Sequence, residues 1–83
     1  MNEADIKERV RSYLTSSQLP GDVGASLQDD DKLLEVLNSL QLLRMVIEIE
    51  SLFGITIDNS ELSVENLGTI DNVAAFVQRK SPA

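Results

Sequence analysis

Ser39 is the side chain in this sequence whose surroundings most clearly suggest chemistry. It follows Asn38, a good helix N-cap residue, and Gln41 stands three positions after Asn38, as in a capping box. Ser39 is therefore predicted to open a helix, where unpaired backbone N–H groups and the positive end of the helix dipole meet. A phosphate ester on its hydroxyl would be stabilised there. Because serines are common in first turns, this position alone also fits a purely structural serine.

The helix that begins at Ser39 is predicted to end at Phe53, because Gly54 supplies a left-handed stop directly after it. At helical spacing, one broad arc is hydrophobic and contains Leu42, Leu43, Met45, Val46, Ile49, Leu52 and Phe53. A narrow polar stripe contains Gln41, Arg44, Glu48 and Ser51. We expect other elements to cover this helix on most of its circumference. Glu50 lies inside the arc, and we expect its carboxylate to bind a loop backbone group, because an unpaired buried carboxylate is costly.

The composition of the chain excludes several classes of function. Its 83 residues form a single domain, residues 1–83, with room for one core and no deep cleft. The absence of cysteine and histidine excludes disulfides, thiol nucleophiles, Cys/His zinc sites and Ser-His-Asp catalysis. The net charge of -7 disfavours nucleic acids and anionic membrane surfaces as partners. With no signal-peptide pattern and no membrane-length apolar stretch, we expect a cytoplasmic monomer that acts as a platform, not an enzyme.

The segments before Ser39 predict one helix and one long loop. Residues 3–16 have hydrophobic side chains at helical spacing, whereas residues 17–31 have the composition of a loop and not of a packed element. Four leucines are expected to pin this loop to the core: Leu27, Leu33, Leu34 and Leu37. A short helical turn is expected at residues 33–36. The acidic cluster at 29–31 lacks the spacing of a calcium loop, so we interpret it as solvated and predict no metal site.

The segments after Phe53 predict one short and one longer helix. Residues 63–67 form a single helical turn capped by Ser63, and Thr69 caps a last helix that Pro82 stops. The inner face of that helix is expected to contain Ile70, Val73, Ala74 and Val77, with Phe76 packing at its edge. The predicted fold class is all-α: a small four-helix bundle of three main helices plus one short helix, with a long loop between the first two helices.

Two segments of the chain together resemble a known protein family. The tripeptide Asn-Ser-Leu at 38–40 opens a helix that closes on Phe-Gly-Ile at 53–55, and the segment Leu-x-x-Glu-Asn-Leu-x-Thr follows at 62–69. This pattern resembles the acyl and peptidyl carrier proteins, whose motif is Asp-Ser-Leu followed by a helix that ends in Phe-Gly-Ile. The distance from the serine to the phenylalanine fits that family, and the resemblance runs over about residues 6–77.

The resemblance implies a function and a cofactor. In carrier proteins a phosphopantetheinyl transferase attaches 4'-phosphopantetheine from coenzyme A to the motif serine, here Ser39. A thioester on that arm then holds acyl or aminoacyl intermediates and presents them to the loading and processing enzymes of a biosynthetic pathway. The missing cysteine fits this role, because the nucleophilic sulfur would belong to the cofactor.

The resemblance also predicts a partner-binding surface on the central helix. The residues expected to contribute to it are Asn38, Leu40, Gln41, Arg44 and Ile47. For Leu40 and Ile47, an exposed contact and a core position are both open interpretations. Arg44 makes the polar stripe nearly neutral, whereas carriers of fatty-acid type resemble one another in an acid-rich central helix. The difference favours a stand-alone carrier of a specialised pathway, of polyketide, nonribosomal-peptide or aminoacyl type.

Asn38 is a second departure, since the family has aspartate at this position. The amide still caps the helix, but the lost charge is expected to narrow the range of transferases that accept the protein. Two alternatives to the carrier function remain open. One is a carrier-like interaction module that is not loaded, and the other is an unrelated helical adaptor that uses the Leu40 and Ile47 surface.

Overall fold

The computed structural model describes residues 2–19 and 21–80, and most of these residues are helical, with no β-strand among them. The α-helices are α1 (Glu3–Tyr13), α2 (Gly21–Ser26), α3 (Ser39–Phe53), α4 (Val64–Leu67) and α5 (Ile70–Lys80). A π-helical turn, Leu14–Gln18, prolongs α1, and 3-10 turns occur at Leu33–Glu35 and Asn59–Glu61. The predicted all-α class is confirmed, and so are the three main helices and the short helix before the last one.

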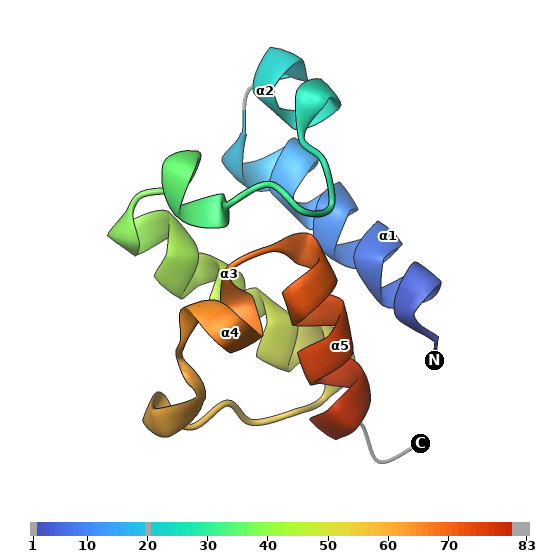
Figure 1. The fold of residues 1–83 in the computed structure, drawn as a ribbon, viewed down its shortest axis with the longest axis vertical. Coiled ribbons are helices and arrows are strands. Elements are labelled where there is room, and N and C mark those ends of the chain that lie inside the picture. The colour runs from blue at the N-terminus through green and yellow to red at the C-terminus, as the bar shows by residue number, and fades with distance from the viewer. Residues whose placement is uncertain (1, 20, 81–83) are drawn as a thin grey trace.

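The three long helices and α4 form a small bundle (Figure 1). Helices α1 and α5 make the most extensive contact between elements, and α4 packs on α5. Helix α3 runs behind α4 and α5 in this view, and the segment that joins α1 to α3 lies across the top of the molecule. None of the described helices has both the length and the hydrophobicity required to cross a membrane.

The three long helices contribute unequally to the core. Helix α1 buries Ile6 and Val10, and α5 buries its predicted inner face of Ile70, Val73, Ala74 and Val77. Phe76 is also buried, with 3% of its surface exposed, so its predicted edge position is wrong. Helix α3 buries only Met45 and Ile49. The expectation that α3 is covered on most of its circumference is therefore wrong, because neighbouring elements pack along only one side of it.

The segment between α1 and α3 is packed and partly helical, so the prediction of a plain loop over 17–31 is wrong. Helix α2 lies within it, and Leu19 and Leu27 are buried on either side. Gly24 allows α2 to approach the π-helical turn closely, since a Cβ atom there would lie 2.8 Å from the Thr15 Cγ2. The tertiary contact thus favours a helix whose two glycines disfavour it locally. Pro20 lies outside the described residues.

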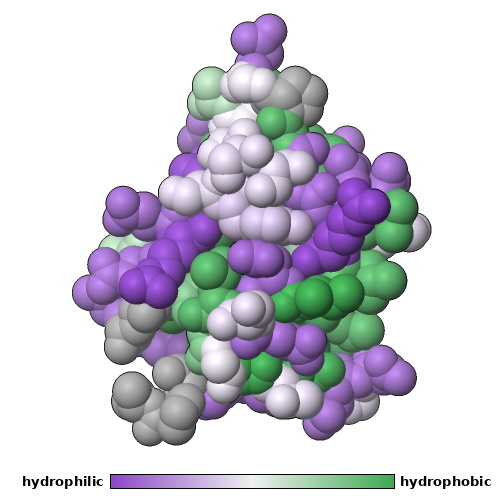
Figure 2. All heavy atoms as spheres, turned by 180° about the vertical axis from the view of Figure 1, so that it is seen from behind, coloured by the Kyte–Doolittle hydropathy of each residue, from purple (hydrophilic) through white to green (hydrophobic). Residues whose placement is uncertain are grey.

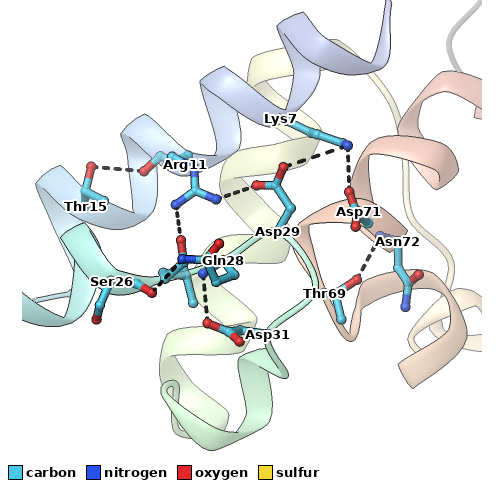
Figure 3. A network of polar contacts seen from close by, with 11 residues as sticks. Lys7, Arg11, Thr15, Ser26, Gln28, Asp29, Asp31, Thr69, Asp71 and Asn72 are labelled. Atoms are coloured by element: carbon cyan, nitrogen blue, oxygen red, sulfur yellow. Dashed lines mark hydrogen bonds and ion pairs between the residues drawn. The ribbon is translucent and has the colours of Figure 1, made fainter.

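Ion pairs connect the segment between α1 and α3 to α1 and α5 (Figure 3). Asp29 pairs with Arg11, and Lys7 lies between Asp29 and Asp71, 2.6 Å from the Asp71 carboxylate. The Asp71 backbone N–H also donates to the Asp29 carbonyl at 3.0 Å. The hydrogen bond to Asp71 raises the pKa of Lys7 above its ordinary value of 10.5. Asp29, which we expected to be a solvated loop residue, therefore joins three elements.

The predicted ends of the helices are mostly confirmed. Gly54 adopts a left-handed conformation with φ of 64° after α3. The hydroxyls of Ser63 and Thr69 accept hydrogen bonds from the N–H groups of the residues three positions later, at 3.2 and 3.0 Å. The expected turn after Lys32 is present, but Leu34 within it is 59% exposed and does not pin the segment to the core. Leu27, Leu33 and Leu37 are buried as expected. Pro82 lies outside the described residues.

Candidate functional site

Ser39 is the first residue of α3, and a complete capping box precedes it. The Asn38 Oδ1 accepts a hydrogen bond from the Gln41 backbone N–H at 2.8 Å. The Gln41 Oε1 in turn accepts one from the Asn38 backbone N–H at 2.9 Å. The local sequence therefore fixes where the helix begins, and the predicted capping pattern is confirmed.

The polar groups of Ser39 are available at the surface. The side chain is exposed, and no hydrogen bond among the described residues involves its hydroxyl. The backbone N–H groups of Ser39 and Leu40 likewise find no acceptor there. The first turn of α3 contains no acidic residue. Unpaired N–H groups and the helix dipole, with no nearby carboxylate in that turn, favour an anionic group on the serine oxygen.

Gln41 has a second contact that the sequence did not predict. Its Nε2 donates to the backbone carbonyl of Gln18 at 3.1 Å, and the Gln18 Nε2 donates to the carbonyl of Gln41 at 2.9 Å. The Gln18 Nε2 also donates to the Tyr13 hydroxyl at 2.9 Å. The two glutamines are 23 positions apart, so no local pattern indicates that they meet.

A hydrophobic groove of about 380 Å³ lies between α3 and α4, and Ser39 is one of the residues that line it. The other lining residues are Leu34, Leu42, Leu43, Met45, Val46, Leu62, Ser63, Val64, Leu67 and Gly68. The groove exists because α3 is covered on one side only, which leaves part of its hydrophobic arc facing α4. An alkyl or other apolar group attached near Ser39 could lie in this groove.

The remaining residues of the expected partner surface, Leu40, Arg44 and Ile47, lie further along α3. Leu40 and Ile47 are 56% and 57% exposed, so the exposed interpretation is correct for both. Arg44 lies between them and forms no ion pair with another described residue. On the rear face of the molecule, hydrophobic side chains gather in the region over which α3 runs (Figure 2). The structure thus brings the predicted residues together on one helix, although Gln41 is half-buried and both ends of its amide are occupied.

Polar contacts hold the α4 side of the groove, and two of them come from α5. Lys80 pairs with Glu61 at 2.7 Å, and the Asn72 side chain donates to the Val64 carbonyl at 3.1 Å. The Asn66 side chain donates to the Glu61 carbonyl at 3.0 Å. The hydrogen bond from Lys80, followed by that from the Asp58 backbone, lowers the pKa of Glu61 below its ordinary value of 4.5. These contacts set the position of α4 opposite α3.

Glu50 lies at the other end of α3 and has a structural role. Its Oε2 accepts a hydrogen bond from the Ile57 backbone N–H at 2.8 Å, which confirms the predicted contact with a loop. Across residues 2–19 and 21–80, no group of three or more acidic side chains is arranged to hold a metal ion.

Comparison with known proteins does not assign the chain to a family. No known family model matches the chain, and no curated protein sequence is similar enough to match it.

Proposed function

We propose that the protein is a carrier that receives 4'-phosphopantetheine on Ser39 and presents acyl or aminoacyl intermediates to the enzymes of a biosynthetic pathway. The observation that carries this proposal is the exposed hydroxyl of Ser39 at the capped start of α3, which has no hydrogen-bond partner among the described residues. The resemblance of residues 38–40 and 53–55 to the carrier motif is the second support.

The surroundings of Ser39 fit a phosphodiester. The N–H groups of Ser39 and Leu40, which have no acceptor in the described part of the chain, and the N-terminal end of the 15-residue helix would stabilise its negative charge. Asn38 caps the helix without adding a carboxylate beside the ester. When bound, phosphopantetheine supplies the thiol that a chain without cysteine lacks, and this thiol would hold the cargo as a thioester.

The chemical role of this chain in loading is to supply one oxygen nucleophile. The Ser39 Oγ would attack the pyrophosphate phosphorus of coenzyme A that carries pantetheine, and the phosphoanhydride bond would break. Adenosine 3',5'-bisphosphate would leave, and the hydroxyl proton would pass to a base of the transferase. The sequence has no histidine or cysteine, and the first turn of α3 contains no carboxylate that could act as the base for this step.

The surface around Ser39 suits a protein that works through partners. We propose that Leu40 and Ile47 insert into hydrophobic depressions of partner enzymes and that Arg44 meets an acidic side chain there. A partner with a basic docking patch would be repelled by Arg44. This chemistry favours enzymes of a specialised pathway, of polyketide, nonribosomal-peptide or aminoacyl type, over fatty-acid enzymes that select an acid-rich helix.

Intact mass spectrometry tests the proposal. The protein is incubated with coenzyme A and a broad-specificity phosphopantetheinyl transferase, and we expect a gain of one phosphopantetheine. Ser39→Ala should abolish the gain, whereas Ser51→Ala, the same change at an exposed serine on the same helix, should leave it intact.

If the wild-type protein gains no mass, the experiment is repeated with Asn38→Asp. A gain in that variant would show a carrier that accepts few transferases, because only the charge at the cap differs. No gain in either protein would contradict the carrier proposal.

A second candidate is an interaction module that is not loaded, which the exposed Leu40 and Ile47 favour. In that case Ser39→Ala would preserve binding to a partner that Ile47→Ala weakens.

A further inference from the structure

The first turn of α3 contributes no fully buried side chain to the core. Between Leu37, which is 4% exposed, and Met45, which is fully buried, the side chains are exposed or half-buried, and Leu42 alone among the hydrophobic ones packs against the core. Helix ends fray when no tertiary contact holds them. Ser39 lies within this stretch, and its own hydroxyl has no partner among the described residues. The position of the Ser39 Oγ therefore depends on the contacts that hold the backbone of the first turn.

The contacts between Gln18 and Gln41 provide that support. Each glutamine side chain donates to the backbone carbonyl of the other, at 2.9 and 3.1 Å. In the described part of the chain, no other hydrogen bond joins the end of α1 to the first turn of α3. Gln41 also binds Asn38 through its remaining amide oxygen, at 2.9 Å. One side chain thus links the helix cap to the segment after α1.

The π-helical turn at Leu14–Gln18 fixes the position of Gln18 in its contact with Gln41. The Leu19 N–H donates to the Leu14 carbonyl at 2.8 Å and closes the turn directly after Gln18. The Tyr13 hydroxyl accepts from the same Gln18 nitrogen, which restricts the amide further. Single π-helical turns are rare and recur at functional sites. Here the turn positions an amide donor and a backbone acceptor opposite the first turn of α3.

We propose that Gln18 is a positioning residue for the modification of Ser39: it holds the first turn of α3 so that the serine oxygen is aligned for transfer of phosphopantetheine from coenzyme A. This inference rests on the proposed function. Gln18 is not itself one of the expected partner-surface residues, although it contacts Gln41 there, so kcat and KM are measured separately to distinguish positioning from docking.

The first test compares Gln18→Ala with Gln78→Ala, which removes an exposed glutamine from α5. Modification rates are measured with a phosphopantetheinyl transferase at saturating coenzyme A and increasing concentrations of the carrier. We expect kcat to fall ~3- to 10-fold in Gln18→Ala, the range that the loss of one hydrogen bond corresponds to. KM should stay within about twofold of the wild-type value, because the docking surface is unchanged. Gln78→Ala should match the wild-type protein in both constants.

A second variant separates positioning from the stability of the helix. Gln18→Met keeps an unbranched side chain of similar length and leaves the capping box of Asn38 and Gln41 intact, but it cannot donate to the Gln41 carbonyl. Its thermal unfolding midpoint should therefore stay near that of the wild-type protein while kcat falls. A fall in kcat without a loss of stability would not follow from a merely structural role.

Amide hydrogen exchange supplies a readout that does not depend on loading. In Gln18→Ala, exchange should accelerate at the Gln41 and Leu42 amides, which donate to Asn38, and remain unchanged in α5. Equal kcat values for Gln18→Ala and Gln78→Ala, or an effect on KM alone, would overturn the inference. If neither the wild-type protein nor Asn38→Asp takes up phosphopantetheine, the proposed function and the role of Gln18 in that reaction are both overturned. The exchange data would still decide whether Gln18 holds the first turn.

Discussion

Two sides of the molecule differ in how their hydrophobic and charged residues are placed. On one side α1 packs on α5, and on the other α3 faces α4. Between α1 and α5, the hydrophobic side chains are buried, and Lys7, Arg11, Asp29 and Asp71 form ion pairs around them. On and beside α3 and α4, large hydrophobic side chains are exposed: Leu34, Leu40, Leu43, Ile47, Leu62 and Val64.

This difference separates stability from interaction within a domain of 83 residues. Hydrophobic side chains that stay largely exposed add little to the stability of the fold, and an exposed hydrophobic surface is typical of sites that bind a partner or an apolar ligand. The α1–α5 side must therefore supply most of the stabilisation. Ser39 lies on the other side, beside the groove, where changes in side chains should affect function before they affect folding.

Replacing one isoleucine on each side is the strongest test of this separation. Ile6→Ala removes a fully buried side chain of α1 and should lower the free energy of unfolding by ~2–5 kcal/mol. Ile47→Ala removes an exposed side chain of α3 and should change it by no more than ~0.5 kcal/mol. Urea denaturation followed by circular dichroism measures both. Similar losses in the two variants would mean that the α3 surface also stabilises the fold.

The far end of α3 provides a test of intermediate size. Glu50→Ala should lower the free energy of unfolding by ~1–3 kcal/mol, because the part-buried Ile57 N–H would lose its acceptor. Glu50→Gln retains an amide oxygen in the same place and serves as the control. If both variants lose equal stability, the charge of Glu50 matters and the hydrogen bond to Ile57 does not.

The ion pairs of the α1–α5 side should have a smaller effect. Asp29→Asn removes the charge that faces Arg11 and Lys7, and thermal unfolding at low ionic strength should show a loss below that of Glu50→Ala. The difference from the wild-type protein should shrink at about 1 M NaCl, where exposed charges are screened. Asp30→Asn, at an exposed neighbour without an ion pair among the described residues, should cause no comparable change. A loss that is insensitive to salt would exclude an electrostatic origin.

The features that the sequence predicted correctly are local ones. Asn38 and Gln41 form the capping box, Ser63 and Thr69 cap the two later helices, and Gly54 ends α3. Each depends on residues within a few positions of one another, so composition and spacing suffice to identify it. The position of Ser39 at the start of its helix was predictable for the same reason.

The features that the sequence missed depend on contacts between distant segments. Helix α2 forms although glycine disfavours helices, because Gly24 packs against Thr15. The hydrophobic arc of α3 could not indicate which part of it faces α4 and which faces solvent, since that depends on the number of neighbouring helices. The contact of Gln18 with Gln41 joins a helix end to a helix start across 23 positions, and neither residue type is distinctive.

The smallest expected effect lies at the α4 wall of the groove and depends on pH. Lys80 lowers the pKa of Glu61 in the folded protein, so this pair stabilises the fold above the ordinary pKa of 4.5. The stabilisation should disappear as the pH falls below 4.5 through the pKa of the folded state, because a protonated Glu61 no longer attracts Lys80.

Glu61→Gln should therefore be slightly less stable than the wild-type protein near neutral pH, and the two thermal unfolding midpoints should converge in acid. Glu65→Gln, an exposed change on α4 that involves no ion pair among the described residues, should show no such convergence. A constant difference between Glu61→Gln and the wild-type protein down to acidic pH would mean that the Lys80 pair does not hold α4. The position of α4 beside the groove would then depend on the hydrogen bonds of Asn66 and Asn72, whose amides do not titrate.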